Sequence, residues 1–128
     1  MLEKGIKGHE ETVVTETNTA KALGSGLLDV FATPAMVALF ELTAWKSVAP
    51  YLEDGSGTVG TLLNVTHDSA TPVGMKVWCD SELVEVDGRR LVFEVTAYDE
   101  KGRIGGGRHE RFIVMNEKFQ SKANAKKG

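Results

Sequence analysis

One stretch in the first half of the chain is apolar on every side of a helix, whereas the second half alternates apolar and polar residues. From Ala35 to Ala44 only Glu41 and Thr43 are polar. A helix that is apolar all round leaves no wide face for water. This stretch therefore predicts a mostly buried helix.

The ends of this helix are expected from the residues that flank it. Thr33 is predicted as the N-cap, with its hydroxyl accepting a hydrogen bond from a free backbone N–H of the first turn. Pro34 suits the first helical position, where no N–H donor is needed. The helix should end near Pro50, because the residue before a proline is pushed out of helical geometry.

The remaining pattern predicts strands and turns around the helix. Upstream, Thr12-Val13-Val14-Thr15 indicates a strand over 9–17, and Gly24-Ser25-Gly26 indicates a flexible turn. Asp87-Gly88 predicts a two-residue hairpin loop between two later strands. Downstream of the helix, period-two runs predict four strands, over 58–70, 75–86, 89–99 and 103–115. One long helix beside an antiparallel meander implies an α+β protein whose sheet wraps around the helix.

Glu41 is the side chain that most needs an explanation. A carboxylate in a mostly buried helix must be paired, hold a shifted pKa, or take part in chemistry. A structural carboxylate inside a dimer interface and a catalytic one are equally good interpretations of the helix alone. Strand parity adds His67, which shares a face with the apolar Leu63 and Val65. A lone inward histidine is usually a satisfied core residue, but together with Glu41 it favours a shared site.

Composition limits the classes of function. The 128 residues suffice for one domain with a real core, but not for two. A net charge of -3 argues against binding to nucleic acid, which usually requires a basic stripe. The one basic stretch, 118–128, is expected to be a frayed, solvated tail. We find neither a signal-peptide core nor a membrane-spanning apolar run, and we therefore expect a cytoplasmic protein.

Two further features can be explained by packing or backbone geometry as well as by a functional role. Cys79 is the only cysteine and has no histidine near it in the sequence, so we expect a packing residue and not a nucleophile. Gly105-Gly106-Gly107 interrupts the last strand. Such a run indicates a bulge, a close approach by a ligand or partner, or a barrel-like bend without any ligand.

The element order and several short motifs resemble a known family. The motifs are Val30-Phe31-Ala32-Thr33, Met36-Val37, Val48-Ala49-Pro50-Tyr51-Leu52-Glu53, Val65-Thr66-His67, Ala70-Thr71-Pro72, Val86-Asp87-Gly88-Arg89-Arg90-Leu91 and His109-Glu110-Arg111. They are similar to the hotdog-fold acyl-CoA thioesterases, and among these to the fluoroacetyl-CoA thioesterase and its bacterial relatives. The resemblance covers nearly the whole chain. It implies a single hotdog domain over 1–128, in which an antiparallel sheet of about five strands wraps around one long central helix.

The resemblance also implies catalytic residues. The family uses a threonine, a glutamate and a histidine, which fall on Thr33, Glu41 and His67. Glu41 would act as a nucleophile or as the general base for water, and both roles remain open. His67 would orient a partner or protonate the departing thiolate. Thr33 lies at the helix N-terminus, where free N–H groups and the helix dipole can stabilise a developing oxyanion.

Three other residues are expected to bind the substrate. The backbone of Gly60 would face the thioester, Arg111 matches an arginine near the end of the family's last strand, and Phe31 is the ring nearest to Thr33. The fluoroacetyl-selective enzyme is rich in phenylalanine upstream of its threonine, whereas positions 24–29 here read Gly-Ser-Gly-Leu-Leu-Asp. The resemblance therefore implies hydrolysis of a short-chain acyl-CoA, but not the fluorinated substrate.

Partners follow from the same resemblance. Hotdog proteins build their sites across a dimer interface, so a homodimer with two shared sites is expected. No cofactor is implied, and Glu41 with His67 supplies too few ligands for a metal site. The alternative is a hotdog protein that binds an acyl-CoA without cleaving it, because a fold does not establish activity. A dehydratase of the same fold is a weaker interpretation, since the motif of those enzymes is absent from the sequence.

Overall fold

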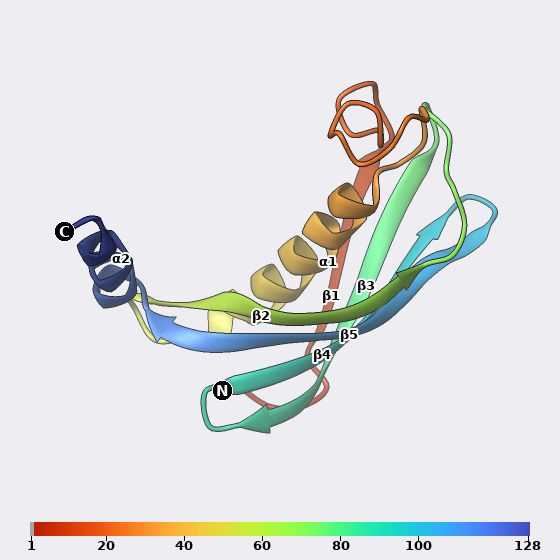
Figure 1. Cartoon of the computed structure of the whole chain (residues 1–128). Helices are drawn as coiled ribbons and strands as arrows, with labels where there is room; N and C mark the ends of the chain where they lie inside the picture. The colour runs from red at the N-terminus through yellow and green to blue at the C-terminus, as the bar shows by residue number, and fades with distance from the viewer. Residues whose placement is uncertain (1) are drawn as a thin grey trace.

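In the computed structural model, which describes residues 2–128, a five-stranded antiparallel sheet curves around the helix α1 (Figure 1). The elements in chain order are β1 (Lys7–Val13), α1 (Thr33–Val48), β2 (Ser56–His67), β3 (Lys76–Asp87), β4 (Arg90–Asp99), β5 (Gly102–Met115) and α2 (Asn116–Asn124). The strands lie in the order β1-β3-β4-β5-β2, so β2 forms one edge of the sheet beside the last strand. The predicted α+β architecture is confirmed.

The core lies between the concave face of the sheet and one side of α1. The buried residues of the helix recur at helical spacing: Met36, Leu39, Phe40, Thr43, Ala44 and Val48. Alternate residues of β3 and β4 are buried against them: Val77, Cys79, Leu83, Leu91, Phe93, Val95 and Ala97. Burying one such large apolar side chain contributes about 1.5–3 kcal/mol. Burial also raises the pKa of the Cys79 thiol to about 11, which confirms that this cysteine is a packing residue.

The opposite side of α1 is not covered by the chain itself. Thr33, Pro34, Ala38 and Trp45 are exposed, while Glu41 is only partly buried. The prediction of a mostly buried helix with no wide face toward water is therefore wrong for a single chain. The sheet passes over one side only, and the apolar residues of the other side face outward.

The start of α1 differs from the prediction. Ala32, in extended geometry, is the N-cap, and no side chain caps the helix. Thr33 is therefore the first helical residue and Pro34 the second. The Thr33 hydroxyl does not cap the helix because it is hydrogen-bonded to the ring of His67.

The end of α1 is where the sequence predicts it, but for another reason. The helix ends at Val48, and a 3-10 turn, η1, covers Ala49–Tyr51. Ala49 nevertheless keeps helical φ and ψ angles of -50° and -43°, so the following proline does not push it out of that region. The α-helical ladder stops because Pro50 has no N–H to donate.

Two predicted boundaries are shifted in the structure. β1 ends at Val13 and does not reach position 17, because side chains of the next residues bond the local backbone: Thr15 N–H donates to the Asn18 side chain, and Thr17 N–H to the Thr15 hydroxyl. The hairpin loop consists of Gly88 and its successor, since the preceding aspartate still pairs with β4. Gly88 has a φ of 61°, which the first loop position of a type II′ turn requires.

The three consecutive glycines of β5 are explained by the neighbouring strands. A Cβ at Gly105 would collide with the Thr66 carbonyl of β2, and one at Gly106 with the Val95 carbonyl of β4. The pairing of β4 with β5 shifts register beside them, leaving Ile104 as the extra residue of a bulge. The run therefore allows adjacent strands to approach closely at a bend.

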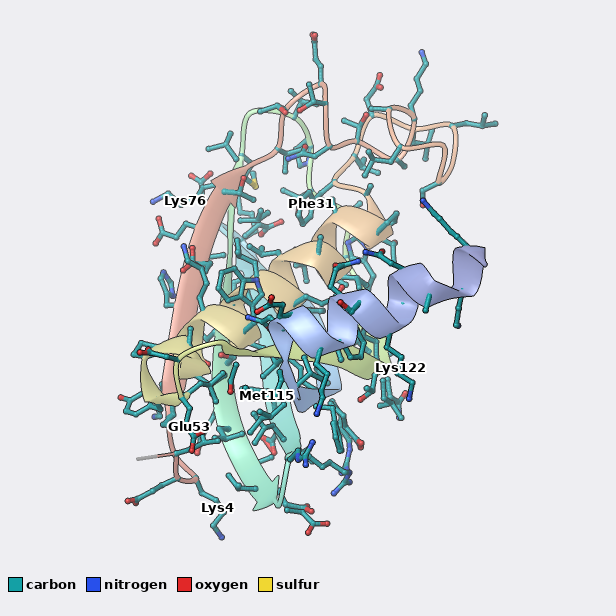
Figure 2. All side chains as sticks on the ribbon, turned by 90° about the vertical axis from the view of Figure 1, so that its left-hand side faces the viewer. Lys4, Phe31, Glu53, Lys76, Met115 and Lys122 are labelled. Atoms are coloured by element: carbon teal, nitrogen blue, oxygen red, sulfur yellow. The ribbon has the colours of Figure 1, made fainter. Side chains whose placement is uncertain are left out.

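The C-terminal residues are helical, which corrects the expectation of a frayed tail over 118–128. They form α2 and a 3-10 turn, η2, over Ala125–Lys127, and none of their side chains is buried. Figure 2 shows Met115 where β5 passes into α2 and Lys122 further along that helix. Glu117 in the first turn and Lys122 in the last complement the helix dipole. Within residues 2–128, no helix is both long and apolar enough to cross a membrane.

Candidate active site

Glu41 lies where α1 passes β2 and β5. Its Oε2 atom accepts a hydrogen bond from Arg111 Nη1 at 3.3 Å. A Cβ at Gly60 would come within 2.5 Å of the same oxygen, so only a glycine lets β2 pass this close to the carboxylate. The Glu41 side chain is 39% exposed in the single chain. Of the alternatives that the sequence left open, the structure shows a paired carboxylate, which is half-buried and not fully enclosed.

Arg111 is fixed by several partners besides Glu41. Its Nε donates to the Thr58 hydroxyl at 2.8 Å, and its Nη2 to the Thr58 carbonyl at 3.0 Å. Its Nη1 also lies 3.1 Å from Nε2 of His109. The arginine side chain is only 6% exposed. Burial lowers the pKa of Arg111 while Glu41 raises it, and the guanidinium remains charged, so the carboxylate offsets the cost of a buried cation.

His109 completes this group, although the sequence analysis gave it no role. The imidazole is fully buried, and its Nδ1 lies 2.9 Å from the Leu62 carbonyl oxygen. Burial lowers the pKa of His109, so its ring is neutral at pH 7. The sequence did contain one signal for His109. Alternate residues of a strand share a face, so positions 109 and 111 lie on the same face of β5.

Thr33 and His67 meet at the N-terminal end of α1. Thr33 Oγ1 lies 2.8 Å from His67 Nδ1. Burial lowers the pKa of His67, and the charge of Asp68 only partly opposes this shift. The Nε2 atom of His67 is buried and has no hydrogen-bond partner within residues 2–128. A neutral imidazole beside a hydroxyl can take up or release a proton during a reaction.

A shallow pocket of about 250 Å³ opens beside this pair. Thr33 and His67 line it together with Phe31 and residues of the loop that precedes the helix. The ring of Phe31 is almost completely buried and belongs to the core, at the N-terminal end of α1 in Figure 2. Leu27 and Leu28, in the loop that precedes the helix, are exposed.

The six site residues predicted from the sequence fall into two groups in one chain. One group contains Phe31, Thr33 and His67, and the other contains Glu41, Gly60 and Arg111. From position 33 to position 41 the helix axis rises by about 12 Å. No hydrogen bond joins the two groups within the part of the chain that the structure describes. The two groups are therefore separated along the helix within one chain, whereas reacting atoms must come within about 3–3.5 Å of each other.

Comparison with known proteins identifies relatives that match this chain in sequence and in fold. The family model of the fluoroacetyl-CoA-specific thioesterases, FlK, matches residues 14–117. A fluoroacetyl-CoA thioesterase of Streptantibioticus cattleyicolor is 47% identical over 98 residues, which are 77% of this chain and 70% of that protein. A solved structure of the fluoroacetyl-CoA thioesterase FlK matches 98% of this chain and 98% of its own, with 39% identity and a TM-score of 0.93. A thioesterase superfamily member from Thermus thermophilus covers 99% of this chain and 94% of its own, with 32% identity and a TM-score of 0.89.

A sheet wrapped around one helix, with a carboxylate in that helix and a histidine–threonine pair at its start, defines a hotdog-fold thioesterase. Within that class, the chain belongs to the fluoroacetyl-CoA-specific thioesterase family. The predicted fold, family and enzyme class are thereby confirmed, and the chain is a thioester hydrolase.

Proposed function

We propose that this enzyme hydrolyses a short-chain acyl-CoA to the free acid and CoA at two sites formed between two copies of the chain. Each site would combine Glu41 of one copy with Thr33 and His67 of the other. The observation that carries this proposal is the separation of the two groups of site residues within one chain. Support for the substrate class comes from the relatives, since an FlK variant with 38% identity and a TM-score of 0.94 was solved in complex with acetyl-CoA.

The uncovered surface beside Glu41 is suited to a second copy. Trp45 of α1 and Leu63 of β2, which shares a face of its strand with His67, are exposed although they are large and apolar. β2 is an edge strand, and its free backbone groups can pair with another strand. A two-fold dimer that covers both features would bring the N-terminal end of one α1 toward Glu41 of the other chain.

The roles of the residues follow from their positions. The first turn of α1 offers N–H groups to the carbonyl oxygen that becomes negative as the thioester is attacked. Glu41 either attacks the carbonyl carbon itself or removes a proton from the attacking water, and Arg111 orients its carboxylate in both cases. Thr33 would position the carbonyl. His67 would orient Thr33 or give a proton to the departing thiolate.

The reaction needs no cofactor, because water, a carboxylate and helix N–H groups supply its chemistry, and CoA enters only as part of the substrate. The enzyme would work in the cytoplasm. Binding of an acyl-CoA without cleavage stays the alternative, and the presence of Thr33, Glu41 and His67 favours hydrolysis.

Hydrolysis of acetyl-CoA by the purified protein is the direct test, with release of thiol followed by a thiol-reactive dye. We expect steady turnover, whereas a binding protein would release no thiol.

Fluoroacetyl-CoA should be preferred over acetyl-CoA only weakly. The preference should not exceed the range of about 10–200-fold that is usual for a small group in an apolar pocket. The reason is that positions 24–29 bring no aromatic ring to the pocket. A much larger preference would show that other residues select the fluorinated acyl group.

A further inference from the structure

We propose that His109 is a positioning residue for Glu41: it takes up one N–H of Arg111 Nη1 and so leaves that nitrogen a single hydrogen bond for the carboxylate. This inference rests on the proposed catalytic role of Glu41. It assigns a function to a buried histidine that touches neither the pocket nor Glu41 directly.

The hydrogen bonds of His109 determine where its proton lies. Its Nδ1 faces the Leu62 carbonyl oxygen at 2.9 Å, and a carbonyl can only accept, so Nδ1 carries the hydrogen. Its Nε2 faces Arg111 Nη1 at 3.1 Å, and a guanidinium can only donate. Nε2 must therefore offer a lone pair. A second proton on the ring would place two donors and two positive charges against each other.

Counting the donors of Arg111 shows what this lone pair does. A guanidinium has five N–H groups. Thr58 takes one from Nε and one from Nη2, while both N–H groups of Nη1 are used, one by His109 and one by Glu41; the second N–H of Nη2 has no acceptor within residues 2–128. Because His109 takes one N–H of Nη1, that nitrogen gives the carboxylate a single hydrogen bond, at Oε2. Within residues 2–128, the other oxygen of Glu41 accepts no hydrogen bond.

The single hydrogen bond from Arg111 to Glu41 has a chemical consequence. An arginine that holds both oxygens of a carboxylate binds it more strongly and fixes both lone-pair sets. Held through Oε2 alone, Glu41 is oriented by Arg111 while Oε1 stays available to attack a carbonyl or to take a proton from water. Without the acceptor at position 109, the second N–H of Arg111 Nη1 would lose its partner. Arg111 could then turn this N–H toward the second oxygen of Glu41.

The surroundings of His109 keep its ring in place. The ring lies beside Phe93, with the ring centroids 6.2 Å apart and the planes at 30°. The pairing of β2 with β5 shifts register between Gly60 and Leu62, next to the carbonyl that His109 contacts. Gly60 and His109 are therefore set by one short section of the sheet, and a small movement of the imidazole would be transmitted through Arg111 to the carboxylate of Glu41 on α1.

The substitutions His109→Asn and His109→Gln separate the two hydrogen bonds. Asparagine can place its amide N–H near the position of Nδ1 and keep the Leu62 contact, but it has no acceptor that reaches Arg111. Glutamine is one methylene longer and can place its carbonyl oxygen near the position of Nε2. We expect His109→Asn to lower kcat by about 10–100-fold with little change in KM, as misplacement of a catalytic group does. His109→Gln should restore kcat to within about threefold of wild type, because the acceptor for Arg111 is kept.

Two measurements keep this test decisive. Both variants lose one buried hydrogen bond, so their melting temperatures should be similar, and equal losses of kcat in both would overturn the proposal. Nitrogen-15 NMR of the unaltered protein at pH 7 should show His109 with its proton on Nδ1, and a ring protonated on Nε2 would also overturn it. Glu41→Gln is assayed in parallel. If that variant is inactive and the two His109 variants behave alike, only this inference fails; if it is fully active, the catalytic role of Glu41 on which this inference rests fails as well.

Discussion

Glu41→Gln is expected to lower turnover by about 10²–10⁴-fold, the usual contribution of a positioned acid or base. The amide keeps the shape of the side chain and an oxygen that can accept from Arg111. It removes the negative charge, and with it both the basicity and the nucleophilicity of the group. The loss should appear in kcat, since the carboxylate acts on the reacting carbonyl and not on the CoA portion of the substrate. Steady-state kinetics of thiol release measures both constants.

The same substitution separates a catalytic carboxylate from a structural one. Arg111 keeps its bonds to Thr58 and His109 in the variant, so the melting temperature should fall by at most about 5 °C. A matched control is Glu10→Gln. Glu10 lies in β1, outside the site, and its Oε2 is 3.8 Å from Nζ of Lys46, which is on the same helix as Glu41. Its turnover should equal that of wild type. If Glu41→Gln instead unfolds more easily and remains fully active, the carboxylate is structural, and the catalytic group must be sought elsewhere in the chain.

Mixing two inactive variants should restore activity. If each site takes Glu41 from one chain and His67 from the other, a heterodimer of Glu41→Gln and His67→Ala chains contains one intact site. After mild unfolding and joint refolding, random pairing should give about a quarter of wild-type turnover, because half of the two-fold dimers are heterodimers with one of two sites intact. Each variant alone should stay below about 1% of wild type.

The control for this experiment is a mixture of Glu41→Gln with the double variant Glu41→Gln, His67→Ala. No pairing of these chains contains an intact Glu41, so no activity should return. Light scattering on the same samples should report dimers at micromolar concentration. Recovery that is absent in the first mixture, although heterodimers form, would place all three catalytic residues of a site in one chain. The separation of the two groups would then have to be closed by a movement within the protomer.

Much of the fold could be predicted because its elements follow local patterns. The helix from Thr33 and the strands that follow it differ in hydrophobic period, and period is a property of neighbouring residues. Boundaries were less predictable. Thr15 and Thr17 have strand-forming side chains, but their local hydrogen bonds end β1 at Val13. Thr33 has the chemistry of an N-cap, yet its hydroxyl is taken by His67, a residue 34 positions away.

The identities of the catalytic candidates were also in the sequence. A carboxylate in an apolar helix is costly without a partner, and Glu41 is therefore conspicuous from the order of residues alone. Likewise, strand parity alone placed His67 on an inward face. Neither argument could name the partners of these residues. A local pattern indicates that a buried polar group needs a partner, but it does not indicate which residue that partner is.

The sequence by itself thus determined the helix, the meander and the residue types of a thioesterase site. Only the tertiary structure decided that Glu41 is held by Arg111, 70 positions away, and that Arg111 is in turn shared with His109. It also decided that Thr33 and His67 lie apart from Glu41 within one chain. The physical reason is that these contacts depend on the order of strands in the sheet and on the register shift at Gly60 and Leu62. Both are set by packing over the whole domain, which no local period along the chain encodes.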